Sequence, residues 1–232
     1  LRWGLITKMY NIPKGYKKTE IGVIPKDWKV SKLSEIARFV NGKAHENSIV
    51  KYGRYIVINS KFISTEGEIR KFSNTPIQPV KKDDVTLVMS DVPNGRAIAK
   101  SFLVDSNDRY TLNQRICALR VNPNEFYPRY LFLQLNRNPD LLAYDDGVKQ
   151  TNLRKDEVLK CRIITPDRKE QQQIADTIFD IDFLITSLEK LIQKKKMIKQ
   201  GVMQELLTGK RRLPGFDGDW GVDLMPNKCW YQ

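Results

Sequence analysis

The 232-residue sequence has very little histidine and cysteine. His45 is the only histidine, which excludes a zinc site built from several histidines and any mechanism that needs two of them. We expect His45 to lie at the surface or to cap a helix. Cys117, Cys161 and Cys229 are far apart and form no Cys-x-x-Cys pair. Disulfides are therefore not expected to form the framework.

Long apolar runs and familiar catalytic loops are also missing. No stretch of about 18 apolar residues occurs, so no membrane-spanning helix is expected. The first residues lack the apolar core and cleavage site of a secretory signal, which favours a cytosolic protein. There is no Gly-x-x-x-x-Gly-Lys-Ser/Thr phosphate loop. The Asn-Pro pairs at 122–123 and 138–139 lack the following proline and aromatic residue that hold a target adenine in amino-methyltransferases. We therefore expect no catalytic residue, metal or cofactor in this chain, so that any methylation is done by another chain.

Acidic residues are fewer than basic residues. The chain has 40 lysines and arginines against 27 aspartates and glutamates, a formal net charge of +13. Such an excess predicts a polyanionic partner, with nucleic acid as the first candidate and an anionic membrane surface as the second.

Residues 53–121 have the pattern of a small β-sheet core. "RYIVIN", "DVTLVMSDV", "RAIAKSFLV" and "QRICALRV" are short β-branched runs separated by turn residues. We expect helices at about 31–41, ended by Gly42, and at about 128–137, with a last strand at "CRIIT". Residues 1–26 are basic, contain several Pro and Gly, and are expected to pack on the surface as an arm. The predicted fold class is α+β, with a mixed α/β domain over 1–165.

A long helix is predicted to follow, over 166–209. Asp167 and Glu170 have the spacing of a capping box, Pro166 suits a helix entry, and Thr208-Gly209 marks the end. A helix reaching Leu207 would have roughly 40 residues and extend about 60 Å.

One face of this helix carries an apolar seam with a heptad repeat. Lys195 and Lys199 interrupt the seam and Gly201 could bend the helix there. Burial of each seam residue contributes roughly 1.5–3 kcal/mol of stabilising free energy. A lone helix in water would not gain this stabilisation. The seam is therefore expected to pair with a second chain; the alternative is that the helix lies wholly on its own domain. The predicted dimer-interface residues are Ile174, Ile178, Ile181, Ile185, Leu188, Ile192, Val202 and Leu206.

The last segment, 210–232, weakly repeats the front of the chain. In both places a proline is followed by an Asp-Trp pair, Asp27-Trp28 and Asp219-Trp220, and then by a leucine. The repeat suggests that a second copy of the front domain begins here. Both tryptophans are expected to be packing anchors.

Three stretches taken together resemble the specificity subunit of type I restriction–modification systems. "TEIGVIPKDWKVSKLSEIA" at 19–37 resembles the entry to a target recognition domain, and "QELLTGKRRLPGF" at 204–216 resembles the end of the family's conserved helix. "GVKQTNLRKDEVLKCRIITPDRKEQQQIADTIFDID" at 147–182 resembles the junction into that helix. The matching positions there are Gly147, Gln150, Asn152-Leu153, Pro166, Glu170-Gln171, Ile174-Ala175 and Asp182. "ITPDRKEQ" departs from the Pro-Pro-Leu-rich approach usual in the family.

This resemblance implies one half of a subunit that normally has two recognition domains and two conserved helices pairing antiparallel. The single domain would read one half of an interrupted site in double-stranded DNA, and two copies would pair through the helix as a homodimer. The resemblance also implies two methylation subunits carrying S-adenosylmethionine, and an ATP-driven restriction subunit in the full complex. This chain would bind neither cofactor.

The candidate DNA-binding residues are basic or amide side chains near predicted turns. Lysine and arginine suit phosphates, arginine suits guanine, and asparagine and glutamine suit adenine. The candidate phosphate contacts are Lys43, Lys51, Arg54, Lys61, Lys81, Lys82 and Lys100. The candidate base readers are Asn94, Arg96, Gln114, Arg115, Lys149, Gln150 and Asn152, with Asn113 beside Gln114.

Two other functions are compatible with the sequence. Pro139-Asp140 and 167–169 (Asp-Arg-Lys) fit the loose pattern of a magnesium-dependent nuclease, although Asp167 is better explained as a helix cap. A basic coiled-coil scaffold without sequence preference is the third interpretation, which equal affinity for all DNAs would support.

Overall fold

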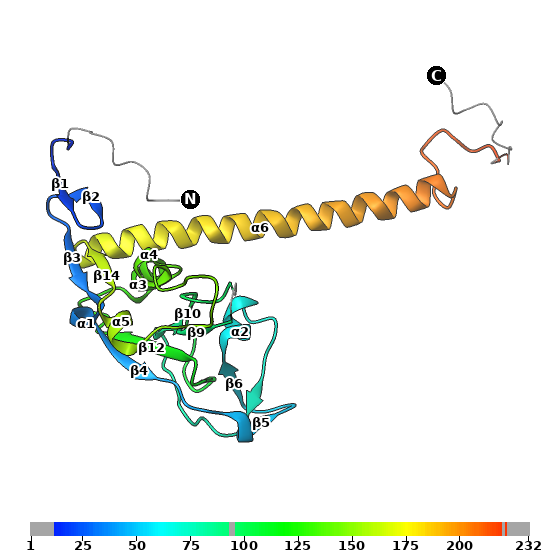
Figure 1. The fold of residues 1–232 in the computed structure, drawn as a ribbon. Coiled ribbons are helices and arrows are strands. Elements are labelled where there is room, and N and C mark those ends of the chain that lie inside the picture. The colour runs from blue at the N-terminus through cyan, green and yellow to red at the C-terminus, as the bar shows by residue number, and fades with distance from the viewer. Residues whose placement is uncertain (1–11, 93–95, 220, 222–232) are drawn as a thin grey trace. The chain divides into compact units, whose positions relative to one another are not determined.

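The computed structural model describes residues 12–92, 96–219 and 221, and Figure 1 shows their fold. The chain divides into two compact units, with the boundary between Thr177 and Ile178. The first unit is a mixed domain of small sheets and short helices together with the first turns of a long helix. The second unit holds the rest of that helix and the segment after it. The predicted α+β class is confirmed.

A four-stranded antiparallel sheet forms the centre of the domain, with strand order β10-β8-β12-β4. Its strands are β4 (Ala37–Asn41), β8 (Val85–Val88), β10 (Ser101–Leu103) and β12 (Ile116–Val121). Strand β8 is buried on both faces, and β12 is buried at every position except Arg120. This burial explains why both strands are nearly continuous apolar runs in the sequence.

A second four-stranded sheet has the order β11-β6-β7-β5. Its strands are β5 (Ile49–Val50), β6 (Tyr55–Ile58), β7 (Phe72–Ser73) and β11 (Tyr110–Leu112). The pair β11–β6 is parallel, and the others are antiparallel. After β6 the chain turns into helix α2 (Ser60–Ser64), where the Asn59 side chain accepts a hydrogen bond from the Phe62 amide at 2.9 Å.

Three two-stranded ladders join distant parts of the chain. They are β1 (Tyr16–Thr19) with β2 (Gly22–Pro25), β3 (Lys29–Lys32) with β14 (Arg162–Thr165), and β9 (Ser90–Asp91) with β13 (Thr151–Asn152). All three are antiparallel. The ladder β14–β3 brings the end of the domain back to its beginning.

The two short helices that the sequence predicted are shorter than expected, and others were not predicted. The short helices besides α2 are α1 (Leu33–Ile36), α3 (Pro128–Leu135), α4 (Pro139–Leu142), α5 (Lys155–Leu159) and the 3₁₀ helix η1 (Glu46–Ser48). The helix predicted at about 31–41 is wrong beyond Ile36. There the chain continues as β4, which pairs with β12 from Ala37 to Asn41. Pairing with a buried strand overrides the helical spacing of the apolar residues in this segment.

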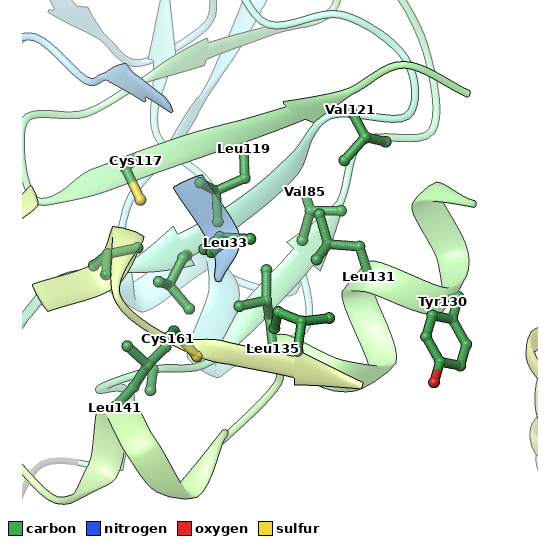
Figure 2. Close-up of a cluster of buried hydrophobic side chains, with 14 of the residues drawn as sticks. Leu33, Val85, Cys117, Leu119, Val121, Tyr130, Leu131, Leu135, Leu141 and Cys161 are labelled. Carbon is green, nitrogen blue, oxygen red and sulfur yellow. The ribbon is translucent and has the colours of Figure 1, made fainter. Parts of the chain in front are cut away.

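Two apolar clusters lie within the domain. The larger one contains Leu33, Leu119, Leu131 and Leu135, which are fully buried between the central sheet and α3, as Figure 2 shows. The smaller one lies beside the second sheet, where the Phe62 and Phe102 rings meet edge to face with their centroids 5.1 Å apart.

The long helix α6 (Arg168–Leu207) has 40 residues, which agrees with the predicted extent. Asp167 caps its start, because its carboxylate accepts hydrogen bonds from the amides of Lys169 and Glu170 at 2.8 and 2.9 Å. The predicted capping box is incomplete, since the Glu170 carboxylate accepts a bond from Trp28 Nε1 at 2.9 Å instead. The half-buried Trp28 thereby ties α6 to the start of the domain. Trp220 lies outside the described residues.

The first turns of α6 pack on the domain. Gln171 is only 1% exposed; its side chain accepts a hydrogen bond from the Tyr127 amide and donates one to the Pro166 carbonyl. The Tyr127 hydroxyl donates to Asp176 at 2.8 Å. Ile174 packs against the larger apolar cluster of its own domain.

In the second unit the apolar seam side chains are exposed except for Leu206, which is half-buried. Ile178, Ile181, Ile185, Leu188 and Ile192 are each between 38% and 53% exposed. Within the described residues, none of the helices combines the length and apolar character that a membrane span needs.

Candidate functional site

The domain has an open hollow of about 580 Å³. It is lined by residues of η1, of α2, of strand β9 with the segment after it, and of the turn at 113–115. Strands of the second sheet also line it, through Ile49 of β5 and Val57 of β6, and Lys71 lies just before β7.

Four of the predicted DNA-binding residues line this hollow: Lys61, Arg96, Gln114 and Arg115. All four side chains are exposed. Lys61, Arg96 and Arg115 have no carboxylate partner within 12–92 and 96–219, so their positive charge is available to a ligand. Gln114 donates a hydrogen bond to the Glu46 carboxylate across the hollow. The backbone N–H of Glu46 itself, followed by this bond from Gln114, lowers the pKa of that carboxyl.

The turn that carries Gln114 and Arg115 is held by close backbone contacts. The Asn113 amide donates to the Ile58 carbonyl at 3.0 Å, and the Gly42 amide donates to the Ile116 carbonyl at 3.0 Å. A Cβ at Gly42 would lie 1.8 Å from the Asn113 carbonyl oxygen. Gly42 is therefore required for this close approach, and its predicted role as a helix stop is wrong.

Asp91 supports the segment that carries Arg96. Its carboxylate accepts hydrogen bonds from the amides of Val92 at 2.9 Å, Ala97 at 2.6 Å and Ile98 at 3.0 Å. These bonds close the loop on both sides of Arg96. The predicted base reader Asn94 lies outside the described residues.

The loop containing Lys149, Gln150 and Asn152 lies next to this wall of the hollow, because β13 pairs with β9 and Asn152 faces Ser90. The Gln150 amide nitrogen donates to Ser90 Oγ at 3.1 Å and to Asn152 Oδ1 at 3.2 Å. Ser90 Oγ donates to Asn152 Oδ1 at 2.7 Å.

Carboxylates hold the turn of the same loop. Asp146 accepts from the amides of Val148 and Lys149, and these bonds lower its pKa. Asp145 accepts from the amide of Gly147 and from the hydroxyl of Thr151. Gly147 adopts a positive φ of 70°, which glycine accommodates without strain.

The remaining candidates are more dispersed. Lys43 is bridged to Asn113 through the backbone and so lies beside the 113–115 turn. The Lys100 carbonyl accepts from the Val88 amide, near the end of β8 that leads to Ser90. Lys81 and Lys82 precede the other end of β8.

Lys51 and Arg54 are placed over tyrosine rings. The charged groups lie 5.5 Å from the Tyr52 ring centroid and 5.2 Å from the Tyr55 ring centroid respectively. The structure does not bring these two side chains into the lining of the hollow.

His45 is not a surface residue, and that prediction is wrong. It is 1% exposed, with Nδ1 donating to the Lys43 carbonyl at 2.7 Å and Nε2 facing Thr111 Oγ1 at 2.8 Å. It occupies the N-cap position of η1, but its side chain makes no capping bond. Its ring instead fixes the backbone beside Glu46 at the rim of the hollow. Sequence reasoning missed the supporting roles of Glu46, Asp91 and Ser90, since no local motif marks them.

The two aspartates of the nuclease interpretation have structural partners. Asp140 receives two guanidinium bonds from Arg162, at 2.7 and 2.5 Å, and these bonds lower the pKa of Asp140. Asp167 caps α6. In the described part of the chain, no three His, Cys, Asp or Glu side chains gather in a way that could hold a metal ion.

Comparison with protein families and curated sequences gives consistent matches. Residues 25–200 match the family model described as "Type I restriction modification DNA specificity domain". The type I restriction enzyme MjaVIII specificity subunit of Methanocaldococcus jannaschii is 28% identical over 90% of this chain and 52% of its own length. A second protein of that organism, provisionally assigned as the MjaX specificity subunit, is 26% identical over 94% of the chain and 56% of its own length. The chain thus spans about half the length of these relatives.

Solved structures show the same fold. The HsdS subunit from Thermoanaerobacter tengcongensis superposes with a TM-score of 0.56 and 15% identity, over 82% of this chain and 47% of the other. The S subunit of the type I restriction–modification system from M. genitalium gives a TM-score of 0.54 and 18% identity, over 77% and 45%.

Proposed function

The chain belongs to the family of type I restriction modification DNA specificity domains, and on that premise we propose that it reads one half of an interrupted site in double-stranded DNA. The single observation that carries this proposal is the gathering of Lys61, Arg96, Gln114 and Arg115 around one open hollow. The nuclease interpretation has no comparable support, since Asp140 and Asp167 are engaged elsewhere.

The hollow supplies both kinds of contact that sequence-specific binding needs. Lys61 on α2 is suited to a phosphate, and such contacts provide affinity that falls with salt. Arg96, Arg115 and the amides of Gln114, Gln150 and Asn152 are suited to base edges in the major groove. The reading domain is proposed to be residues 1–165, with 166–209 as the spacer helix and 210–232 as the start of a second recognition domain.

The exposed seam of α6 supports pairing with a second copy. An apolar stripe at heptad spacing that remains exposed on its own chain is typical of a helix that pairs with another helix. Leu184, Leu191 and Ile198 widen the stripe on one side and are about half exposed. Ile174 is left out of the proposed interface, because it packs on its own domain.

The two seam lysines favour an antiparallel pair. In a parallel pair in register, Lys195 would face Lys195 of the partner and Lys199 would face Lys199, so that like charges would meet at the interface. In an antiparallel pair the two lysines of one chain need not meet those of the other, and each ammonium group can extend to water. A two-fold dimer of this kind places identical readers on opposite strands, so that the site is an interrupted palindrome.

The proposed partners are DNA methylation subunits that carry S-adenosylmethionine and, in the full complex, an ATP-driven restriction subunit. This chain would supply the sequence choice and no catalytic group.

Selection of binding sites from randomised duplex DNA by the purified full chain tests the proposal. Enrichment of two inverted half-sites at a fixed spacing supports it. Equal recovery of all sequences contradicts it and favours a scaffold without sequence preference, and magnesium-dependent cleavage lost in both Asp140→Ala and Asp167→Ala would favour a nuclease.

A further inference from the structure

Gln150 and Asn152 do not have independent side chains. The two amides and the Ser90 hydroxyl form a closed set of hydrogen bonds, with donor–acceptor distances of 2.7, 3.1 and 3.2 Å. Ser90 is only 8% exposed, whereas both amide side chains are exposed. The buried hydroxyl therefore anchors the inner sides of two amides that face solvent.

The bonding pattern determines what each amide offers to a ligand. Asn152 Oδ1 already accepts two bonds, so Asn152 presents its Nδ2 donors. Gln150 Nε2 donates to both partners, so Gln150 presents its Oε1 acceptor. Within the described residues, neither outward atom has a hydrogen-bond partner of its own. The result is one donor beside one acceptor.

The backbone around this cluster is fixed from several sides. Strand β13 pairs with β9, the Leu153 amide donates to the Met89 carbonyl at 2.7 Å, and the Ser60 hydroxyl donates to the Ser90 carbonyl at 3.4 Å. The cluster is therefore ordered before any ligand binds, which lowers the entropic cost of recognition.

We infer that Ser90, Gln150 and Asn152 together read the major-groove edge of one adenine, with Ser90 as the positioning residue. Adenine offers an N7 acceptor beside an N6 amino donor, which complements the Asn152 donor and the Gln150 acceptor. Guanine offers two acceptors on the same edge, so its O6 would face the Gln150 oxygen unfavourably. This inference rests on the proposed function and adds a specific base and a residue that does not itself touch DNA.

Three substitutions separate these roles. Ser90→Ala removes both hydroxyl bonds and leaves the strand pairing intact, so adenine preference at one position should fall about tenfold, the size of one lost base contact. Ser90→Thr keeps the hydroxyl and should retain the preference. Asn152→Asp still accepts both internal bonds but offers no donor, so the preference at that position should change from adenine to cytosine, whose N4 amino group a carboxylate accepts.

Sites are selected from randomised duplex DNA with the full chain and each variant, and thermal melting checks the fold. Ser101→Ala, on β10, is the matched control and should leave every base preference unchanged. If the wild-type chain selects no motif, the proposed function itself fails. If the wild-type chain selects a motif that Ser90→Ala and Asn152→Asp leave unchanged, the proposed function stands and this inference is overturned.

Ser90→Ala should weaken the base preference at one position of the motif. If the wild-type chain selects a G·C pair at that position, the adenine assignment is overturned. If the melting temperature of Ser90→Ala is far below that of the wild-type chain, the Asn152→Asp variant tests the inference instead, because it keeps the internal hydrogen bonds.

Discussion

Arginine side chains in this domain have two distinct uses. The Arg162 guanidinium makes two bonds to Asp140 and one to Glu20 at 3.3 Å, which join α4 and the β1–β2 hairpin to β14. Arg115 lies on the hollow without a carboxylate partner among the described residues. The net charge of the sequence does not distinguish these uses. Whether an arginine forms a salt bridge depends on which acidic side chains the fold brings near it. For this reason the composition was enough to predict a polyanionic partner. The residues that line the hollow could be identified only from the structure.

Lys61 and Arg115 are predicted to contribute to DNA binding in different ways. Lys61→Ala should weaken binding to all sequences and reduce the slope of log K against log salt by about 0.9, the value for one lost phosphate contact.

Arg115→Ala should reduce the preference for one base pair by about 1–3 kcal/mol. Titration of specific and unrelated duplexes at several salt concentrations measures both effects.

Lys160→Ala provides the comparison, since Lys160 pairs with Asp156 at 3.4 Å and lies outside both the lining of the hollow and the predicted phosphate contacts. An equal loss of affinity from Lys160→Ala and Lys61→Ala would show that the hollow is not the binding site.

The Asp140–Arg162 pair is predicted to make stability depend on acid pH. The pKa of Asp140 is lowered in the folded state by its bonds to Arg162, so this carboxylate contributes stability above its unfolded pKa of about 3.9. That contribution is lost as the pH falls through the lower folded-state pKa. Asp140→Asn should reduce the free energy of unfolding by about 1–2 kcal/mol near neutral pH and by much less below pH 3.

Urea unfolding between pH 2.5 and 7 measures this difference. Asp105→Asn is the control, because Asp105 and Arg109 form an exposed pair at 3.4 Å and such pairs contribute little. A constant Asp140→Asn effect across the pH range would contradict the assignment.

At the scale of elements, the sequence predicted strands and long helices better than junctions. The runs around β6, β8 and β12 and the helix from 128 were placed correctly, because continuous β-branched segments and long apolar periodicity reflect burial directly. The segment 31–41 was misread, since the spacing of Leu33, Ile36 and Val40 suits a helix while β12 pairs with the last part as a strand. Long-range pairing of this kind has no local signal.

Gly42 shows how one residue sets a junction. Gly42→Ala would place a methyl group against the Asn113 carbonyl, so the 113–115 turn must move. We expect a loss of about 1–3 kcal/mol in stability, typical of overpacking, together with weaker base selection by Gln114 and Arg115. Thermal melting and site selection measure the two effects. Gly218→Ala is the control, since a Cβ there meets nothing within 4 Å. An unchanged melting temperature for Gly42→Ala would contradict the argument.

The seam of α6 is predicted to carry dimerisation. Ile185→Asp places a charge within the proposed interface and should convert the dimer to monomers at micromolar concentration. The substitution removes roughly 1.5–3 kcal/mol of apolar burial free energy per chain and adds the cost of desolvating a carboxylate. Sedimentation velocity measures the change.

Phe183→Asp is the matched control, because Phe183 is 76% exposed on α6 and lies off the heptad seam. Equal loss of the dimer in both variants would show that pairing does not follow the seam.

For the whole molecule, the resemblance found at 19–37 and 147–182 agrees with the family match over residues 25–200 and with the fold of solved S subunits, while the stretch at 204–216 lies beyond that match. The physical reason is that the two matched stretches form the frame of the domain, since β3 pairs with β14 and α6 begins at Arg168. Individual base-reading side chains on turns are set by local contacts such as those of Asp91 and Ser90. The exposed apolar seam of α6 leads to the central proposal, that two copies complete one DNA-reading unit.

A map of methylated bases in host cells with and without the gene tests this claim most directly. We predict that deletion abolishes methylation at one motif, an interrupted palindrome with two identical inverted halves. Loss of an asymmetric bipartite motif would contradict the symmetric dimer, and an unchanged map in cells that express the chain and its methylation partners would contradict DNA specificity altogether.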